Sequence, residues 1–452
     1  MEVQTATPSR RLAEWAAAID AADIPARVRQ RTADILLDTV ASALAGRHGD
    51  ETAMVESVAQ GLAGGDEATV IGAGRLTRVG ATLLNGYQVT AVTVCDVYRP
   101  NLCHVTPEIV PPALATAEGR AVSGRDLVTA LAAGLETTVR VGRGIRYASF
   151  RERGWHSPGV IGPFGGAMAA GRLLGLDAER MLWALGLAGS QASGTFAHWG
   201  TPTIKFHQGR GATSGLIAAT MAAEGFRSSE EILAHPDGGI FNAYSDGGEP
   251  EAVVERLGDE WELERISLRL WPAASSIQGA VSAVFDLVNE HDLTPEMVER
   301  MTITLSEPTY RMHGEMTWET RFRALLSTRY AAAVVMHDRA CWLEQFSQER
   351  IADPVVDAFA RDRIEVVADA AMPTTGAAVD VELTDGGRLT VKRDVPKGDA
   401  DDPLSRDELV GKFRQAASGL LSDAATEDAL EVLLGIEEVD DIDRLMRAVR
   451  VA

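Results

Sequence analysis

The spacing of apolar residues predicts that the first 265 residues form mainly packed helices. Between residues 25 and 45 the apolar positions fall roughly on one helical face, and Gly46 follows as a stop. Ser123 and Asp126 form a capping box that predicts the start of a long helix. Helices are predicted over 25–45, 81–97, 111–118, 123–139, 157–174 and 211–225, with one more from Asp177.

Residues 151–174 combine a polar opening with a run of very small residues. His156 is followed by Ser157-Pro158, which is N-cap and first-turn chemistry, so we predict His156 at a helix N-terminus. The glycines and alanines that follow lower helix propensity, which is tolerated where another backbone comes very close. We therefore expect a buried helix whose start faces a cavity. An imidazole there could act as a base or acid beside a bound anion, or could simply cap a core helix.

The second half of the chain changes to patterns typical of strands, with helices between them. Strands are predicted at 301–307, at 363–368 and on both sides of a turn at 385–387, and helices at 325–336, 353–359 and 405–448. These patterns predict a mainly α fold that is helical over 1–265 and again over 400–452. A smaller α+β domain is predicted over 266–399.

A first polar loop, residues 98–106, lies between two predicted apolar helices. It places Arg99 and His104 shortly after Asp96, so an acid, a base and a cation come together where a rigid scaffold often carries catalytic residues. A metal site made of Asp96, Cys103 and His104 is an alternative, but the spacing fits no common ligand pattern. A structural surface loop is the other alternative.

A second polar loop is predicted over residues 191–210, and it contains Lys205 and His207. Two residues apart on a strand-like segment, these side chains would share a face. Apolar neighbours on both sides favour a Lys205 side chain that is fixed within the fold. The alternative is a side chain that snorkels toward solvent. Arginines gathered before His156, including Arg153, could hold carboxylates in fork geometry.

Composition and charge exclude several classes of function. With 452 residues, 46% of them hydrophobic, the chain can bury a large core in two or three domains. A net charge of −22 argues against a nucleic-acid or anionic-membrane partner. The 3 cysteines lack C-x-x-C spacing, so they imply neither a disulfide framework nor a zinc ribbon. We see no signal-peptide pattern and no apolar span, and we therefore expect a cytoplasmic protein.

Six motifs occur in order along almost the whole chain. They are LLNGYQVTAVTVCDV, VPPALATAEG, RGWHSPGVIGPFGGAMAAGRLLGL, TPTIKFHQGRGATSGLIAATMAAEGF, LWPAASSIQGAV and KGDADDPLSRDELVGKF. Together they resemble the MmgE/PrpD family, which includes 2-methylcitrate dehydratase, cis-aconitate decarboxylase and iminodisuccinate epimerase. The resemblance implies that residues 1–265 and 400–452 form one large all-helical domain, and that the active site is shared between it and the smaller α+β domain. It also implies a homodimer that needs no metal or organic cofactor.

The resemblance assigns family residues to positions of this chain. The family's aspartate corresponds to Asp96, its loop histidine to His104, its next histidine to His156, its lysine to Lys205 and its tyrosine to Tyr330.

Three positions depart from the family pattern. The threonine that often follows a doubled aspartate is absent from Asp96-Val97-Tyr98. Arg269 stands where many members have a lysine, and Gln278 stands where a histidine is usual. A positive charge is therefore kept, while one titratable group is lost.

Proton abstraction from a carbon next to a carboxylate is the reaction that would use these acidic, basic and cationic residues together. We predict a hydro-lyase of the 2-methylcitrate dehydratase type that acts on a di- or tricarboxylic acid. His104 and His156 would transfer protons, with Asp96 orienting an imidazole. The predicted catalytic residues are Asp96, His104, His156, Lys205 and Tyr330, and the predicted substrate-binding residues are Arg99, Arg153, His207, Arg269 and Gln278.

Other functions stay open at this point. An epimerase of an iminodisuccinate-like dicarboxylate is favoured by Arg269 and Gln278, and a decarboxylase of the cis-aconitate type would form the carbanion by C–C cleavage instead. A non-catalytic carboxylate-binding protein would explain the lost histidine and threonine. A metallo-hydrolase is disfavoured because the chain has no H-E-x-x-H motif.

Overall fold

The computed structural model describes residues 6–451 and confirms the predicted fold class, a large helical part with a smaller α+β part. The described chain clusters into two compact units. The helical unit comprises residues 6–91, 95–266 and 405–451, and the α+β unit comprises 92–94 and 267–404. Among the described residues, none of the helices combines the length and the hydropathy required to cross a membrane.

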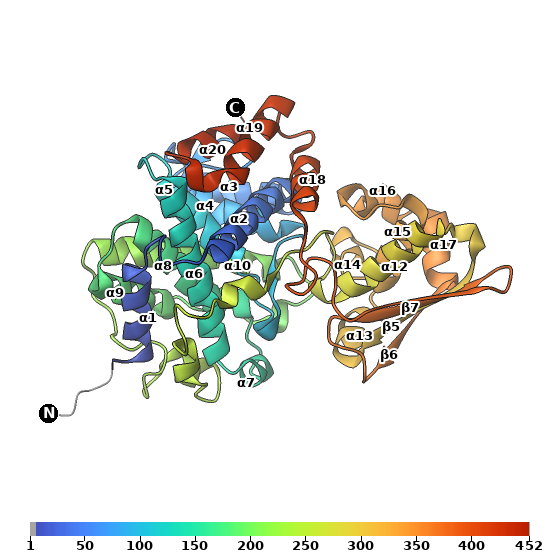
Figure 1. Cartoon of the computed structure of the whole chain (residues 1–452), viewed down its shortest axis with the longest axis horizontal. Coiled ribbons are helices and arrows are strands. Elements are labelled where there is room, and N and C mark those ends of the chain that lie inside the picture. Colours follow the sequence, from blue (N-terminus) through green and yellow to red (C-terminus); the bar gives the residue numbers. More distant parts are fainter. Residues whose placement is uncertain (1–5, 452) are drawn as a thin grey trace. The chain divides into compact units, whose positions relative to one another are not determined.

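The helical unit contains fourteen of the α-helices assigned to the described chain (Figure 1). They are α1 Pro8–Ala18, α2 Ala26–Gly46, α3 Thr52–Ala63, α4 Arg78–Ala91, α5 Thr106–Ala117, α6 Gly124–Gly144, α7 Tyr147–Glu152, α8 Ser157–Leu173, α9 Ala178–Ser190, α10 Thr203–Ala223, α11 Ile240–Tyr244, α18 Arg406–Ala417, α19 Asp423–Leu434 and α20 Asp443–Ala448. The short strands β1 Ala68–Thr69 and β2 Arg75–Leu76 pair antiparallel in the same unit.

Helix α8 is the centre of the helical unit, and the prediction that it is a buried helix of small residues is confirmed. It packs against α5, α6, α9 and α10. A Cβ on Gly165 would lie 2.3 Å from the carbonyl oxygen of Gly134 on α6, and one on Gly215 of α10 would lie 2.9 Å from a backbone nitrogen of α8. The small residues of this helix therefore permit contact between backbones, as the sequence pattern implied.

Substituting glycines at two helical positions is expected to have opposite effects on stability. In Gly166→Ala the new methyl would lie 2.4 Å from the carbonyl oxygen of Glu108, a backbone atom that cannot swing aside. We expect a loss of about 1–3 kcal/mol in the free energy of unfolding, from overpacking. Gly61→Ala on α3 meets nothing within 4 Å and is expected to gain about 0.5–1 kcal/mol. Urea unfolding of both variants checks the pair, and equal effects would contradict the packing argument.

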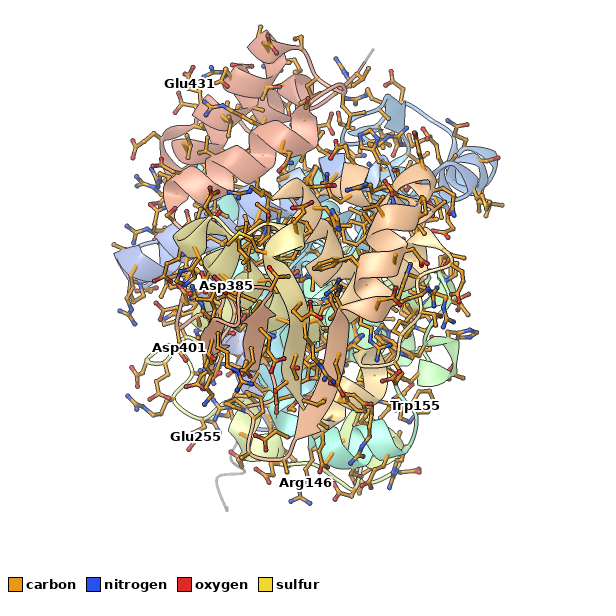
Figure 2. The ribbon with its side chains drawn as sticks, turned by 90° about the vertical axis from the view of Figure 1, so that its right-hand side faces the viewer. Arg146, Trp155, Glu255, Asp385, Asp401 and Glu431 are labelled. Carbon is orange, nitrogen blue, oxygen red and sulfur yellow. The ribbon has the colours of Figure 1, made fainter. Side chains whose placement is uncertain are left out.

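The α+β unit is built on a four-stranded sheet of order β6-β5-β7-β8. β5 pairs parallel with β6 and antiparallel with β7, and β7 pairs antiparallel with β8. The Asp385 turn, labelled in Figure 2, joins β7 to β8 with Gly386 at a φ of 88°, as the predicted hairpin required. Helices α12 and α15 cover the sheet (Figure 1). The elements are α12 Gln278–His291, β5 Val298–Ser306, α13 Glu307–His313, α14 Arg321–Ala324, α15 Thr328–Asp338, α16 Gln348–Ile351, α17 Pro354–Asp362, β6 Ile364–Asp369, β7 Ala377–Leu383 and β8 Arg388–Arg393.

The C-terminal helices belong to the helical unit. Helix α18 packs on α2, and α19 and α20 follow beside it (Figure 1). Lys412 of α18 and Asp38 of α2 form an ion pair of 2.5 Å whose side chains are almost fully buried.

Two predicted helix boundaries near the first polar loop were wrong. Helix α4 ends at Ala91, so Asp96 lies in the connection after the helix rather than at its end. Helix α5 begins at Thr106, and Pro111 and Pro112 lie inside it instead of starting it. Pro112 has no N–H for the carbonyl of Glu108, and that carbonyl faces Gly166 of α8. The prolines are therefore accommodated by close interhelical packing, which local sequence does not reveal.

Candidate functional site

The loop before α5 is organised by Asp96. Its buried carboxylate accepts hydrogen bonds from the main-chain N–H groups of Val105 and Thr106 at 2.7 and 3.1 Å, and from the Thr106 hydroxyl at 2.6 Å. These are unsatisfied donors at the start of α5, so the carboxylate caps this helix from a distant position in the loop. Burial raises the pKa of Asp96 to about 6, while the bonds from Thr106 and Val105 act in the opposite direction.

His104 is held by the same residue, but through the main chain. Its Nδ1 lies 2.7 Å from the carbonyl oxygen of Asp96. Because a carbonyl can only accept, Nδ1 carries the proton in this hydrogen bond, and Nε2 is the lone-pair atom of the neutral ring. Asp96 was expected to orient an imidazole; in the structure its carbonyl does so, and its carboxylate caps α5.

His156 lies at the N-terminus of α8, as predicted, and is the N-cap residue. It follows Trp155, which is labelled in Figure 2 and whose ring packs at a tilt against the ring of Tyr244, with 4.7 Å between the ring centroids. Its Nδ1 lies 3.0 Å from Nδ1 of His207 on α10, and both rings are buried. Burial lowers the pKa of His156 well below its ordinary value, and the neighbouring His207 and His104 lower it further. The structure therefore brings the predicted residues His104 and His207 close enough to His156 for their charges to influence its pKa.

Aromatic and cationic side chains border this pair. The His156 ring meets the Phe196 ring edge-on at 6.0 Å, and the Arg151 guanidinium lies over Phe196 at 3.4 Å. Phe196 also stacks on Trp199 at 5.3 Å. These contacts place a positive charge near the imidazoles, where an anionic ligand would be stabilised.

Lys205 and His207 do not share a face, which corrects the strand-like interpretation of this segment. Helix α10 begins at Thr203, so both residues are helical. At 3.6 residues per turn, positions two apart point about 200° from each other. Lys205 is buried, and its Nζ donates to the carbonyl of Ala91, whereas His207 faces His156.

The remaining predicted residues have varied surroundings. Arg99 is half-buried in the 3₁₀ turn Arg99–Asn101, while Arg153 is exposed. In the α+β unit, Arg269 and Gln278 are buried, and both donate to the carbonyl of Ala273, at 3.2 and 2.9 Å. Tyr330, also in that unit, donates its hydroxyl to the carbonyl of Gln345 at 2.6 Å.

Sequence reasoning missed Glu108 of α5. Its side chain is fully buried against Gly162, and a Cβ there would lie 2.4 Å from Cγ of Glu108. Neither carboxyl oxygen has a hydrogen-bond partner among the described residues. Burial raises the pKa of Glu108 well above its ordinary value, and the charge of Asp96 adds to the shift, so both effects favour the protonated form of this acid. The only available signal was an acidic residue in an otherwise apolar stretch.

Arg210 of α10 was also missed. It donates to the carbonyls of Gln191, Gly159 and Ser193 at 2.6, 2.7 and 2.7 Å. Arg210 thereby connects the loop after α9 to the start of α8, where His156 is the N-cap residue. The one indication of this role in the sequence is that Arg210 ends the polar segment 191–210 before a stretch of small residues.

Potential metal ligands are not clustered in the described part of the chain. Within residues 6–451, no group of three or more His, Cys, Asp and Glu side chains is arranged as a metal site. The rival set of Asp96, Cys103 and His104 therefore does not form such a group.

The buried histidines give an expected pH dependence of stability. Burial, followed by Arg210 and His198, lowers the pKa of His207 to about 4, below the 6.5 of an unfolded chain. The unfolded state then binds more protons between these values, so the free energy of unfolding falls as pH drops from 6.5 toward 4. Over this range His207 lowers the free energy of unfolding by on the order of 3 kcal/mol. The pKa of His313 is also lowered to about 4, so His313 adds to the loss of stability.

Urea unfolding across this pH range measures the effect. His207→Asn is expected to flatten the dependence, whereas the same change at the exposed His291 serves as the control and should leave it unaltered. An unfolding free energy that does not vary between pH 6.5 and 4 would contradict the assignment of neutral buried imidazoles.

Comparison with known proteins covers nearly the whole chain. The MmgE/PrpD N-terminal domain model matches residues 10–253, and the MmgE/PrpD C-terminal domain model matches residues 271–436. Cis-aconitate decarboxylase of Aspergillus terreus is 26% identical over 96% of this chain and 94% of its own length. The cis-aconitate decarboxylase-like protein oryM of Aspergillus oryzae is 28% identical, with coverage of 99% and 98%. The Homo sapiens cis-aconitate decarboxylase is 26% identical, with coverage of 92% and 89%.

Proposed function

The chain belongs to the MmgE/PrpD family, and from this premise we propose that it is a cofactor-independent hydro-lyase acting on a di- or tricarboxylic acid. The family and the full-length relatives identify an enzyme with a lyase-type activity of the decarboxylase or dehydratase kind. The choice of dehydration, the substrate class and the residue roles are our inference.

The buried pair of His156 and His207 is the observation that carries the proposal. A carbon-bound proton next to a carboxylate is weakly acidic, so its removal needs an unprotonated base held close to it. The lowered pKa values keep both rings neutral near pH 7. A neutral imidazole has a ring nitrogen lone pair that can accept this proton, and the carbanion left on the substrate would be stabilised by nearby positive charge.

The remaining roles follow from position. His104, whose ring is oriented through Nδ1 by the Asp96 carbonyl, would be the second proton-transfer group, with Nε2 as the atom that accepts or returns a proton. Lys205, buried beside Ala91, would contribute positive charge. The roles expected for Arg269, Gln278 and Tyr330, the homodimer and the cytoplasmic location stay predictions.

A reaction panel in D₂O tests the proposal. The purified protein is incubated with 2-methylcitrate, citrate and cis-aconitate while alkene absorbance, CO₂ release and deuterium incorporation are followed. We expect loss of water with formation of a C=C bond and no CO₂. Deuterium exchange with inversion and no elimination would instead identify an epimerase, and turnover of none of the acids would overturn the proposed substrate class.

Decarboxylation of a cis-aconitate-like acid is the second candidate function. It is favoured by the activity for which these relatives are named, since each of them matches this chain over most of its length. It would require a proton donor to the carbanion after C–C cleavage. Glu108, whose protonated form is favoured by burial, or an imidazolium would have to serve as this donor. Stoichiometric CO₂ release from cis-aconitate in the same panel would favour it over dehydration.

A further inference from the structure

The contact between His156 and His207 joins two ring nitrogens of the same kind. At an Nδ1···Nδ1 separation of 3.0 Å, one nitrogen must carry a hydrogen and the other must offer a lone pair. The two tautomers are therefore linked. The ring that donates through Nδ1 has a bare Nε2, and the ring that accepts has its proton on Nε2.

Both rings are fixed from several elements. The main-chain N–H of His156 donates to the carbonyl of Gly194 at 3.0 Å. Gly194 also lies over the second ring, since a Cβ on it would be 3.1 Å from Nδ1 of His207. Arg210 holds the neighbouring Ser193 carbonyl at 2.7 Å. The hydrogen bond between the rings therefore lies in a packed environment that leaves little freedom to rotate either imidazole.

The groups that act on this pair are basic. Arg151 and His104 act on His156, and Arg210 and His198 act on His207. With neighbours of this sign, the resting pair is favoured as two neutral rings that share one hydrogen bond. Carboxylates of a bound substrate would supply the negative charge that an imidazolium needs when a proton is taken up.

We propose that His207 is a positioning residue that accepts the Nδ1 proton of His156 and so keeps Nε2 of His156 unprotonated as the base. The inference rests on the proposed function and replaces the substrate-binding role expected for His207. Because this contact occupies Nδ1 of His156, Nε2 is the ring atom left to react, and only the arrangement in which Nδ1 of His156 donates leaves a lone pair on that Nε2. In the reaction the C–H bond breaks, its electron pair stays on the carbon next to the carboxylate, and the proton moves to Nε2. Nδ1 keeps its proton and its bond to His207 throughout.

The tautomer can be measured without any turnover. Long-range ¹H–¹⁵N correlation spectra of the ¹⁵N-histidine protein, assigned with His156→Gln and His207→Asn, report which ring nitrogens are protonated. We expect Nδ1 of His156 to be protonated and its Nε2 bare. A proton on Nε2 of His156 would overturn the inference. Because this readout needs no substrate, it stays informative even if the proposed reaction fails.

Kinetics on the acid that the reaction panel identifies provide the second test. His207→Leu removes the acceptor and is expected to lower kcat by about tenfold or more with little change in KM. His207→Asn places an amide oxygen near the position of Nδ1 and should recover most of kcat. His235→Asn, in an exposed loop of the same unit, is the matched control. A raised KM with unchanged kcat in both His207 variants would instead identify substrate binding and reject the positioning role.

Discussion

His156→Gln is expected to lower kcat by about 10²–10⁴-fold, the usual contribution of a positioned general base. Glutamine can keep a hydrogen bond to His207 and fit the buried space, but its amide cannot take up a proton near neutral pH. The loss should therefore appear in kcat and kcat/KM alike, because it affects the transition state more than binding. Steady-state kinetics on the acid that the reaction panel identifies measures it.

His235→Gln is the matched control for this prediction. His235 is an exposed histidine in the same unit, and its Nδ1 contacts only its own loop at Asp237. We expect its kcat to stay near that of the parent. A folded His156→Gln protein with parental kcat would remove His156 from the reaction and move the search for the base to His104.

Some features of the fold and the site were predictable from the sequence because residues close to them in the chain determine them. Ser157-Pro158 after a polar segment predicts a helix start, and the structure places His156 at that N-cap. The small residues that follow predict close backbone packing, and Gly165 meets the backbone of α6. The turn at Asp385 and the alternation along β5 likewise depend on neighbours in sequence.

Other parts were not predictable because their cause lies far along the chain. The start of α5 is set by the Asp96 carboxylate about ten residues earlier, so the two prolines that looked like a helix start fall inside the helix. Lys205 and His207 were placed on one face because a polar, Gly- and Thr-rich segment resembled a loop, yet it is the first turn and a half of α10.

The burial of Glu108 was also not predictable, because it depends on residues of other helices. A carboxyl group in an apolar helix predicts an exposed position, but Gly162 and Gly211, on two other helices, leave room for its side chain in the core. Glycines that seem to serve only helix contact therefore also admit a buried acid near Asp96. This electrostatic coupling of Glu108 to Asp96 could be seen only once α5, α8 and α10 were brought together.

Lys412→Met is expected to cost about 3–5 kcal/mol in the free energy of unfolding. Its ammonium is fully buried and pairs with Asp38 at 2.5 Å, so the variant leaves a carboxylate buried without this partner. The pair joins α18, far along the chain, to α2, and its loss should loosen the attachment of the C-terminal helices. Urea unfolding followed by circular dichroism measures the loss.

Two further variants separate the charge effect from a general sensitivity of α18. Lys412→Met combined with Asp38→Leu removes both charges and should recover most of the stability, because the cost comes from one buried charge without its partner. Arg414→Ala removes an exposed ion pair to Glu427 from the same helix and should change stability little, since exposed pairs contribute little. If Lys412→Met proved as mild as Arg414→Ala, the ion pair would not be what attaches the C-terminal helices to α2.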